Sequence, residues 1–570
     1  MRVLAFLAAT LLSIAAPQLH IDLRYYYGSP AAERDNRRQL SDEVHAFLRT
    51  RVSDVASPQQ LNAWLDRYDG LLKALEKDDV YVYLRAEEDD ADTGDARADD
   101  AIASEEDALA AHVDQVLEAL GRDRALHFAA VYPPLARYRY FIVLAISRAA
   151  HVVSPDRTRD ADATLAVTPA SYKALRKQVI AAHGKDAAAF ALHQDEFASM
   201  LVTVAMANDA IARARGLHNA VDAAYFDRSL TSASVDRVLT AVRTSDAYRR
   251  YDAVLASAAA KRSVSTQPGL IPIDDALATI VAAEQPMGSV YSDAFSKLLD
   301  PRNGRLELCT EPACDTTGFS VGFAGIRSAL FVGGDYVGNT NGVRKIAHEA
   351  AHAVHRELMS EHQPIAVYNL GPQWMFESFA IFNEFLLFDH LYATADSPVE
   401  RAYYTNAFLD DATFNVFGSA EETELEAQLH HAIIARSART AADFDAITLR
   451  VFAHYDPLAS RDPGVRYYWA RDSLYFTDPL YDVNYLYAGL LALNYLDAFE
   501  RDPSSFSKRY VALLENGFTE PPAGLERRFL GIDITDERGL VRTATTLIDR
   551  RTAALKRLYE EAEASGAPNL

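Results

Sequence analysis

The stretch that decides the fold is Val343-Arg-Lys-Ile-Ala-His348-Glu349-Ala-Ala-His352-Ala-Val-His355. Two histidines four residues apart on a helix project from the same face, so His348 and His352 can bind the same metal ion. Glu349 then lies beside the water that such an ion holds, where a carboxylate can act as a general base. Residues 339–341 offer N-caps, and the small and aliphatic neighbours favour burial. The stretch therefore predicts a buried helix that carries two zinc ligands.

The H-E-x-x-H pattern is typical of metallopeptidases, but it also occurs by chance, so the surrounding sequence has to support it. A catalytic zinc ion of this type needs a third protein ligand. Glu377 is the best candidate, because it lies in 374–388, a segment that is apolar on nearly all sides and where an unpaired carboxylate is costly. The alternative is a buried glutamate that pairs with an arginine or a lysine.

Two further residues have the spacing of groups that hydrogen-bond to metal ligands. Glu384 lies two turns after Glu377 on the same helical face, and from there it can orient a ligand. His355 follows His352 by one turn, and the alternative interpretation is a histidine of the core.

Tyrosines are dense in 467–489. Aromatic residues at this density usually form core or interface. A phenolic hydroxyl can also donate a hydrogen bond to the oxyanion that amide hydrolysis creates. Because Tyr481 and Tyr485 share one helical face, we expect both to point into the cleft.

Composition narrows the class of protein. The chain has 570 residues, 49% of them hydrophobic, and a formal net charge of −23. Such a charge argues against nucleic acid or an anionic membrane surface as a partner. Long periodic stretches with modest Gly and Pro predict a mainly α protein, and the length of the chain predicts two lobes or subdomains. We expect a monomer. We also expect no stable membrane insertion, because beyond the N-terminus no segment approaches about 20 apolar residues.

The N-terminus has the features of a secretory signal peptide. Met1-Arg2 precedes an apolar run that ends in small residues at Ala16, so 1–16 is the predicted signal and the protein is expected to be exported, to the periplasm or the medium. An uncleaved anchor is the alternative. A Pro/Gly interruption at 267–272 divides an N-terminal helical region, 17–270, from a catalytic region, 271–570.

Short strands are expected just before the zinc-binding helix. Strand-forming residues and Gly punctuation in 304–309, 318–323 and 327–332 predict a small β-ribbon. Such a strand can hold a peptide by main-chain hydrogen bonds, although a purely structural hairpin is equally compatible. Cys309 and Cys314 flank a Pro-containing turn and are predicted to form a local disulfide.

Helices are expected elsewhere, with breaks at Ser154-Pro155, Thr168-Pro169 and 232–234. The acidic run 85–100 is interpreted as a solvated loop that leads into a helix, because its carboxylates lack the order of an EF-hand.

Three blocks resemble the zinc oligopeptidases of the thimet oligopeptidase and oligoendopeptidase F group, most closely oligoendopeptidase F. Residues 348–355 are similar to the family pattern HExGHxxH, residues 377–384 to ExPSQxxE, and residues 479–485 to PFYxxxY. The resemblance implies two helical lobes around a deep central channel, one Zn²⁺ per chain held by His348, His352 and Glu377, and endopeptidase action on oligopeptides.

The sequence departs from the family pattern in two places. Tyr475 occupies the position of a family histidine thought to position substrate or stabilise the transition state, and the Pro-Ser-Gln after the zinc glutamate is missing. Two alternatives follow from these departures and from the fold: a relative that binds zinc and peptides without efficient cleavage, or a zinc carboxypeptidase of related fold.

Overall fold

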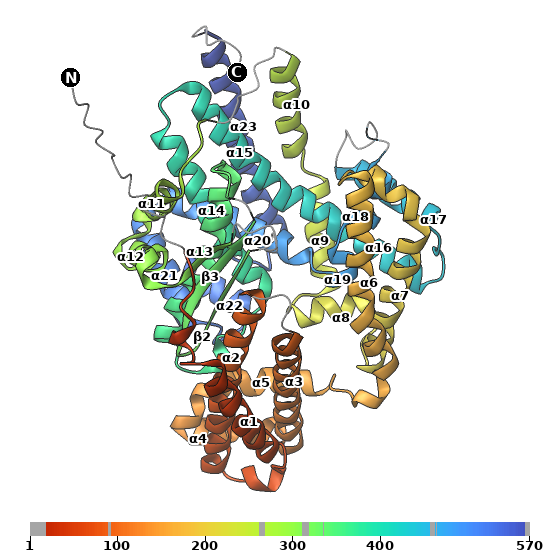
Figure 1. The fold of residues 1–570 in the computed structure, drawn as a ribbon, viewed down its shortest axis with the longest axis vertical. Coiled ribbons are helices and arrows are strands. Elements are labelled where there is room, and N and C mark those ends of the chain that lie inside the picture. The colour runs from red at the N-terminus through yellow and green to blue at the C-terminus, as the bar shows by residue number, and fades with distance from the viewer. Residues whose placement is uncertain are drawn as a thin grey trace, which may run out of the picture.

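The structure is a computed structural model that describes residues 19–88, 93–260, 268–309, 318–334, 336–455, 462 and 464–564. Over these residues it is mainly helical with one three-stranded sheet, which confirms the predicted fold class (Figure 1). The predicted signal peptide and the pairing of Cys309 with Cys314 lie outside the described residues and stay predictions. No described helix has the length and apolar character needed to cross a membrane.

Five N-terminal helices form a lower lobe (Figure 1). They are α1 (Pro30–Phe47), α2 (Pro58–Glu88), α3 (Thr93–Leu120), α4 (Arg122–Val131) and α5 (Arg139–Ala149). Helix α1 begins where the hydroxyl of Ser29 accepts a hydrogen bond from the backbone N–H of Ala32, and its apolar stripe ends in the fully buried Phe47. Capping and apolar periodicity thus place this helix as the sequence predicts.

The next five helices lie beside and above this lobe. They are α6 (Arg159–His183), α7 (Gln194–Ala214), α8 (Ala220–Asp227), α9 (Ser232–Arg243) and α10 (Ala247–Ala260). The break expected at Thr168-Pro169 is wrong, since α6 continues through Pro169. Tyr172, one turn later, is fully buried and stacks on Phe476 at 4.1 Å between ring centroids, and this packing outweighs the missing proline N–H.

The remaining chain contains the sheet and a second set of helices. Before and within the sheet come α11 (Ile273–Ala283), α12 (Ser289–Leu299), β1 (Leu306–Cys309), β2 (Gly318–Phe323) and β3 (Ile326–Gly333). After it come α13 (Thr340–His362), α14 (Gln373–Thr394), α15 (Pro398–Thr413), a π-turn (Phe414–Gly418), α16 (Ser419–Ile434), α17 (Ala441–Tyr455), α18 (Tyr468–Arg471), α19 (Leu474–Thr477), α20 (Val483–Arg501), α21 (Pro503–Asn516), α22 (Pro522–Leu525) and α23 (Glu537–Ala564).

The sheet has the order β1-β3-β2, with β1 parallel and β2 antiparallel to β3. Neighbouring residues of the central strand face opposite sides of a sheet. Ala329 therefore packs into the core of the lower lobe, whereas Leu330 packs into the core formed by the later helices. One strand thus belongs to two hydrophobic cores.

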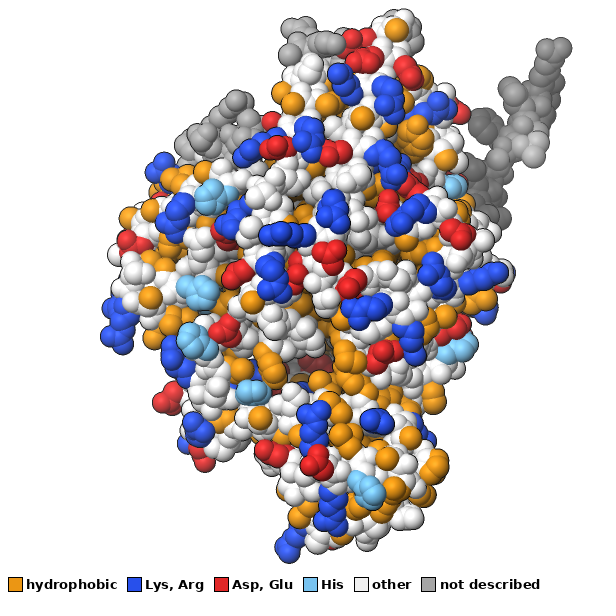
Figure 2. Space-filling view, turned by 180° about the vertical axis from the view of Figure 1, so that it is seen from behind, with side chains coloured by type: hydrophobic (Ala, Val, Ile, Leu, Met, Phe, Trp, Pro, Cys, Tyr) orange, Lys and Arg blue, Asp and Glu red, His pale blue; other side chains and the backbone are white. Residues whose placement is uncertain are grey.

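The lower lobe also contacts a short 3₁₀ turn, Ala366–Tyr368, that connects α13 with α14. Near this junction a cavity of about 530 Å³ is lined from both sides, by residues such as Tyr140 and Leu370. Figure 2 shows hydrophobic side chains gathered on the reverse face where the lower lobe joins the rest. The boundary at residue 270 is not tested by these contacts and stays a prediction.

Candidate metal centre and active site

Helix α13 carries the H-E-x-x-H residues and begins at Asn339, whose side chain accepts a hydrogen bond from the N–H of Gly342 at 2.7 Å. The helix packs closely against α14, because its buried face is made of small residues such as the fully buried Ala347 and Ala351. This close packing brings α14, and with it Glu377, within reach of the two histidines.

Three side-chain atoms converge between the two helices. The two Nε2 atoms of His348 and His352 are 3.2 Å apart, and Oε2 of Glu377 lies 3.3 Å from the first and 3.5 Å from the second. Ligands around a tetrahedral zinc ion with bonds of about 2.0–2.1 Å are separated by roughly 3.3 Å. Oε2 of Glu377 is moreover buried without a hydrogen-bond partner in the described structure. The residues therefore fit a zinc ion.

The second oxygen of Glu377 is held by two donors. Nε2 of Gln373 donates to Oε1 at 2.9 Å, and the hydroxyl of Tyr481 donates to the same atom at 3.3 Å. These bonds fix the carboxylate so that Oε2 faces the histidines. Tyr481, predicted to support the oxyanion, thus contacts the proposed metal ligand.

A chain of polar contacts extends from the other side of His348. Its Nδ1 lies 2.5 Å from Oε1 of Glu384, and Nη1 of Arg344 donates to Oε2 of Glu384 at 2.7 Å and to Asp411 at 3.2 Å. A carboxylate on Nδ1 leaves Nε2 with its lone pair directed at the site. Glu384 therefore occupies the orienting position that its spacing predicts.

The pKa values of the site residues are shifted because several titratable groups lie close together. Burial alone raises the pKa of Glu377, but His352 and His348 hold it well below its usual range. Burial lowers the pKa of His348, but the neighbouring carboxylates of Glu377 and Glu384 raise it well above its usual value. A metal ion at these residues would therefore compete with protons for the same atoms.

Glu349 lies at the edge of the sheet. It is 8% exposed, and burial raises its pKa, the direction that strengthens a carboxylate as a base. Gly318, the first residue of β2, packs against it so closely that an added Cβ would approach Oε1 of Glu349 to 2.7 Å. A side chain at this position would therefore displace the carboxylate of Glu349.

A cavity of about 440 Å³ opens onto these groups. Its lining includes His348, Glu349 and Tyr485, whose ring packs edge-on against Tyr481 at 5.4 Å between centroids. Burial raises the pKa of Tyr485, so its hydroxyl keeps its proton and stays a donor. Tyr475, by contrast, is fully buried and donates to the carbonyl of Glu422 at 3.1 Å.

His355 is 1% exposed and lies among aromatic rings, 4.6 Å from Phe379 and 5.0 Å from Phe376 between centroids. Its Nδ1 has no hydrogen-bond partner among the described residues, and burial holds its pKa well below the usual value. This is the surrounding of the core histidine that we considered as the alternative.

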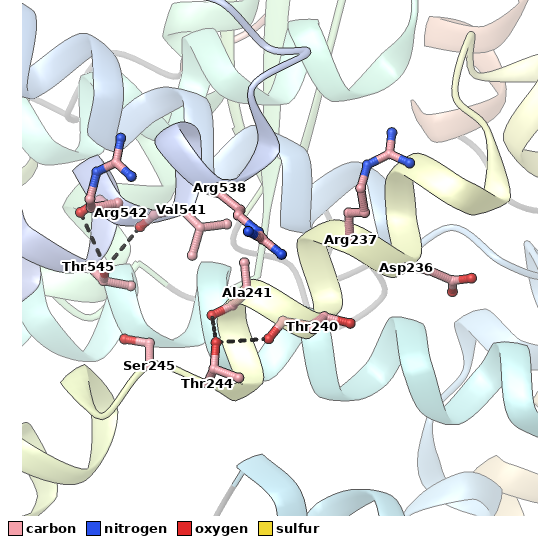
Figure 3. Close-up of a pocket in the computed structure, with 10 residues that line it drawn as sticks. All are labelled: Asp236, Arg237, Thr240, Ala241, Thr244, Ser245, Arg538, Val541, Arg542 and Thr545. Carbon is pink, nitrogen blue, oxygen red and sulfur yellow. Dashed lines mark hydrogen bonds between the residues drawn. The ribbon is translucent and has the colours of Figure 1, made fainter.

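Sequence reasoning missed Arg344 and Gln373, which hold Glu384 and Glu377. Both have a detectable signal, because each lies four residues before a site residue on the same helix and hence on the same face: Arg344 before His348, and Gln373 before Glu377. A separate groove between α9 and α23 contains Arg237, Arg538 and Arg542 and none of the site residues (Figure 3).

No protein-family model matches the chain, and no curated protein matches it in sequence. Several solved structures are similar in fold. A candidate peptidase from Chlamydophila abortus matches with a TM-score of 0.73 and 17% identity over 96% of this chain and 99% of its own. The oligoendopeptidase-F from Enterococcus faecium matches with a TM-score of 0.62 and 17% identity over 93% and 99%.

Metallocarboxypeptidase 1 from Trypanosoma cruzi is more distant, with a TM-score of 0.52 and 12% identity over 93% of this chain and 99% of its own. These identities are low, so the likeness concerns the arrangement of the backbone. Nearly the whole length of both chains is covered in each pair. The chain therefore has the fold of the oligoendopeptidase F structures.

Proposed function

We propose that the protein is a zinc-dependent endopeptidase that hydrolyses short peptides. The observation that carries the proposal is the convergence of His348, His352 and Glu377, with one carboxylate oxygen buried and unpaired at ligand distance from both imidazoles. A structural zinc site usually has four protein ligands, whereas three ligands beside a cavity leave a position for water and substrate.

The residues divide the work as follows. Zinc bound at the triad would supply a water of lowered pKa and an electrophile for the scissile carbonyl. Glu349 takes the proton from the attacking water and passes it to the leaving nitrogen. Tyr485, which lines the cavity, donates to the oxyanion that develops on the carbonyl oxygen. Tyr481 holds Glu377 in place and supports the ring of Tyr485.

Strand β2 offers a way to hold the peptide. It is one of the two edge strands of the sheet, and its first residue, Gly318, touches Glu349. A substrate in extended conformation along β2 would be bound through its main chain and would pass the general base. Binding of this kind depends little on side chains, in keeping with oligopeptides as the substrate class.

The decisive experiment measures cleavage of quenched short peptides by zinc-loaded protein, with Glu349→Gln as the matched variant. We expect turnover by the wild type and a loss of about 10²-fold or more in the variant at unchanged zinc content. Equal inactivity of both proteins with zinc bound would contradict the proposal and would favour a relative that only binds peptides.

Two further measurements separate the parts of the proposal. Glu377→Ala should abolish stoichiometric zinc binding, and unchanged metal content would remove this residue from the ligand set. Mass spectrometry of the products distinguishes internal cleavage from stepwise release of C-terminal residues, the outcome that a carboxypeptidase would give. Export and a monomeric state remain predictions, to be checked by fractionation and by light scattering.

A further inference from the structure

A second group of acidic side chains lies in the same cavity as the zinc triad. Glu422 belongs to α16, Asp472 follows α18, and Asp482 precedes α20. One carboxylate oxygen of each lies within 4.8 Å of the other two. All three line the cavity that also contains His348 and Glu349. Segments that span residues 422–482 thus bring three carboxyl groups to one place.

Hydrogen bonds within the described residues do not satisfy every carboxylate oxygen of this group. The hydroxyl of Tyr468 donates to Glu422, and the N–H of Leu474 donates to Asp472 at 3.0 Å. Asp482 is 2% exposed, and its Oδ2 is buried without a hydrogen-bond partner in the described part of the chain. A buried carboxylate without any donor is costly unless a cation or a proton neutralises it.

No basic side chain of the described residues supplies that charge by an ion pair. Arg228 is paired with Asp478 at 3.9 Å, and Arg471 lies over the ring of Tyr468 at 4.5 Å. Burial, with further acidic groups next to it, raises the pKa of Asp482 well above its usual range, and burial raises that of Glu422 to about 8. None of the three carboxyl groups therefore has an ion pair among the described residues, and Arg471 acts on Glu422 and Asp472 only through its charge.

We propose that Glu422, Asp472 and Asp482 bind a divalent cation, best fitted by Ca²⁺, at a site separate from the zinc triad. Three carboxylates and no nitrogen or sulfur form a hard donor set of the kind that Ca²⁺ prefers over Zn²⁺. Two oxygens on one Ca²⁺ lie at most about 5 Å apart, since each bond is about 2.3–2.6 Å long, and the observed group stays within that span. Water from the cavity completes the coordination.

The bound cation ties three segments together close to the catalytic tyrosine. Asp482 directly follows Tyr481 and precedes Tyr485 by one turn, while Leu480 adopts a left-handed backbone with φ of 64°. A cation on Asp482 would fix this strained turn against α16 and so hold both tyrosines in position. The site does not depend on zinc or on peptide cleavage, and it is testable without either.

The test uses terbium luminescence on the full chain, loaded with zinc and freed of other metals. Tb³⁺ replaces Ca²⁺ on oxygen ligands and emits when a neighbouring tyrosine is excited, and Tyr468 contacts Glu422 directly. We expect emission from the wild type that Ca²⁺ displaces. In Asp482→Asn the affinity for Tb³⁺ should fall by roughly tenfold or more, because the ligand set loses a charge.

Two controls assign the signal. Asp293→Asn removes an exposed carboxylate on α12 and should leave the emission unchanged. Glu377→Gln disrupts the zinc triad and should leave Tb³⁺ binding intact, so failure of the proposed function and failure of this site are distinguishable. Ca²⁺ should also raise the melting temperature of the wild type and not that of Asp482→Asn, a readout that both folded proteins allow.

Three results would overturn the proposal. One is equal Tb³⁺ affinity in the wild type and Asp482→Asn, which would place the ion elsewhere. Another is the absence of any emission that Ca²⁺ displaces. The third is emission displaced by a lysine-containing peptide and not by Ca²⁺, which would make the group a subsite for a cationic part of the substrate.

Discussion

His348 is held from both sides of its ring, by Glu377 at Nε2 and by Glu384 at Nδ1. Arg344 in turn holds Glu384, and together with His348 it keeps the pKa of that buried carboxyl at about 2 against the effect of burial. We predict that Glu384→Gln lowers zinc affinity about 10- to 100-fold by weakening the anchor on Nδ1. Competition with a chelator measures this, and Glu361→Gln, on the exposed face of α13, should behave as wild type.

The two tyrosines should differ when each loses its hydroxyl. Tyr485→Phe removes a donor that faces the cavity and is expected to lower kcat by about 10²-fold with unchanged zinc affinity. Tyr481→Phe removes a hydrogen bond to Glu377 and should weaken zinc binding more than it lowers kcat of the loaded protein. Equal effects of the two variants on both quantities would contradict this division of roles.

Glu526 predicts a pH dependence of stability. It is fully buried against the hydroxyl of Tyr495, and burial raises its pKa from 4.5 to about 8. The folded chain keeps this proton up to about pH 8, whereas the unfolded chain releases it near pH 4.5, so this residue lowers stability as pH rises between these values. Glu526→Gln should therefore gain on the wild type by up to about 1.4 kcal/mol per pH unit in that window. Melting at pH 5, 6.5 and 8 tests the trend, and a pH-independent difference would refute it.

At the residue scale, the sequence predicted positions that depend on local periodicity. The spacing of His348 and His352 and the apolar surroundings of Glu377 were sufficient for the triad, which the structure brings together. The acidic group at Glu422 and Asp482 was not foreseen, because contacts between segments so far apart leave no periodic signal in one sequence. For the same reason the hydrogen bond from Tyr481 to Glu377 could not be read from the helical face alone.

At the scale of elements, β2 is tied to the general base by its first residue. We predict that Gly318→Ala displaces Glu349 and lowers kcat/KM by roughly tenfold or more, with zinc content unchanged, because the added Cβ would overlap the carboxylate. Ser320→Ala, on the same strand, is the matched control and should keep its activity. Normal activity of Gly318→Ala would show that Glu349 has room to move.

The strands themselves were predicted within a few residues, since Gly punctuation and strand-forming side chains mark them locally. The parallel pairing of β1 with β3 was not, because it depends on where the chain returns after the segment between β1 and β2. Pro169 shows the opposite case, in which a strong local signal for a helix end is outweighed by the burial of Tyr172.

At the scale of the whole molecule, Asp69 links the lower lobe to the turn that follows α13. Its Oδ1 accepts the N–H of Ala366 at 2.6 Å, and its Oδ2 pairs with Lys73 at 2.9 Å. Asp69→Ala leaves a buried N–H without a partner, and we expect it to lower the free energy of unfolding by about 1–3 kcal/mol. Urea denaturation measures the loss. The exposed Asp42→Ala serves as control, and an unchanged midpoint for Asp69→Ala would contradict the role of this contact.

The strand shared by the two cores also has a consequence for the order in which the chain is synthesised. The helices of the lower lobe leave the ribosome first, but their core includes Ala329 of β3 and Tyr368 of the turn after α13. Until this part of the chain leaves the ribosome, the core of the lower lobe lacks apolar side chains such as Val321 and Ala366. The core of the lower lobe can therefore be completed only after the ribosome has made helix α13 and the turn that follows it.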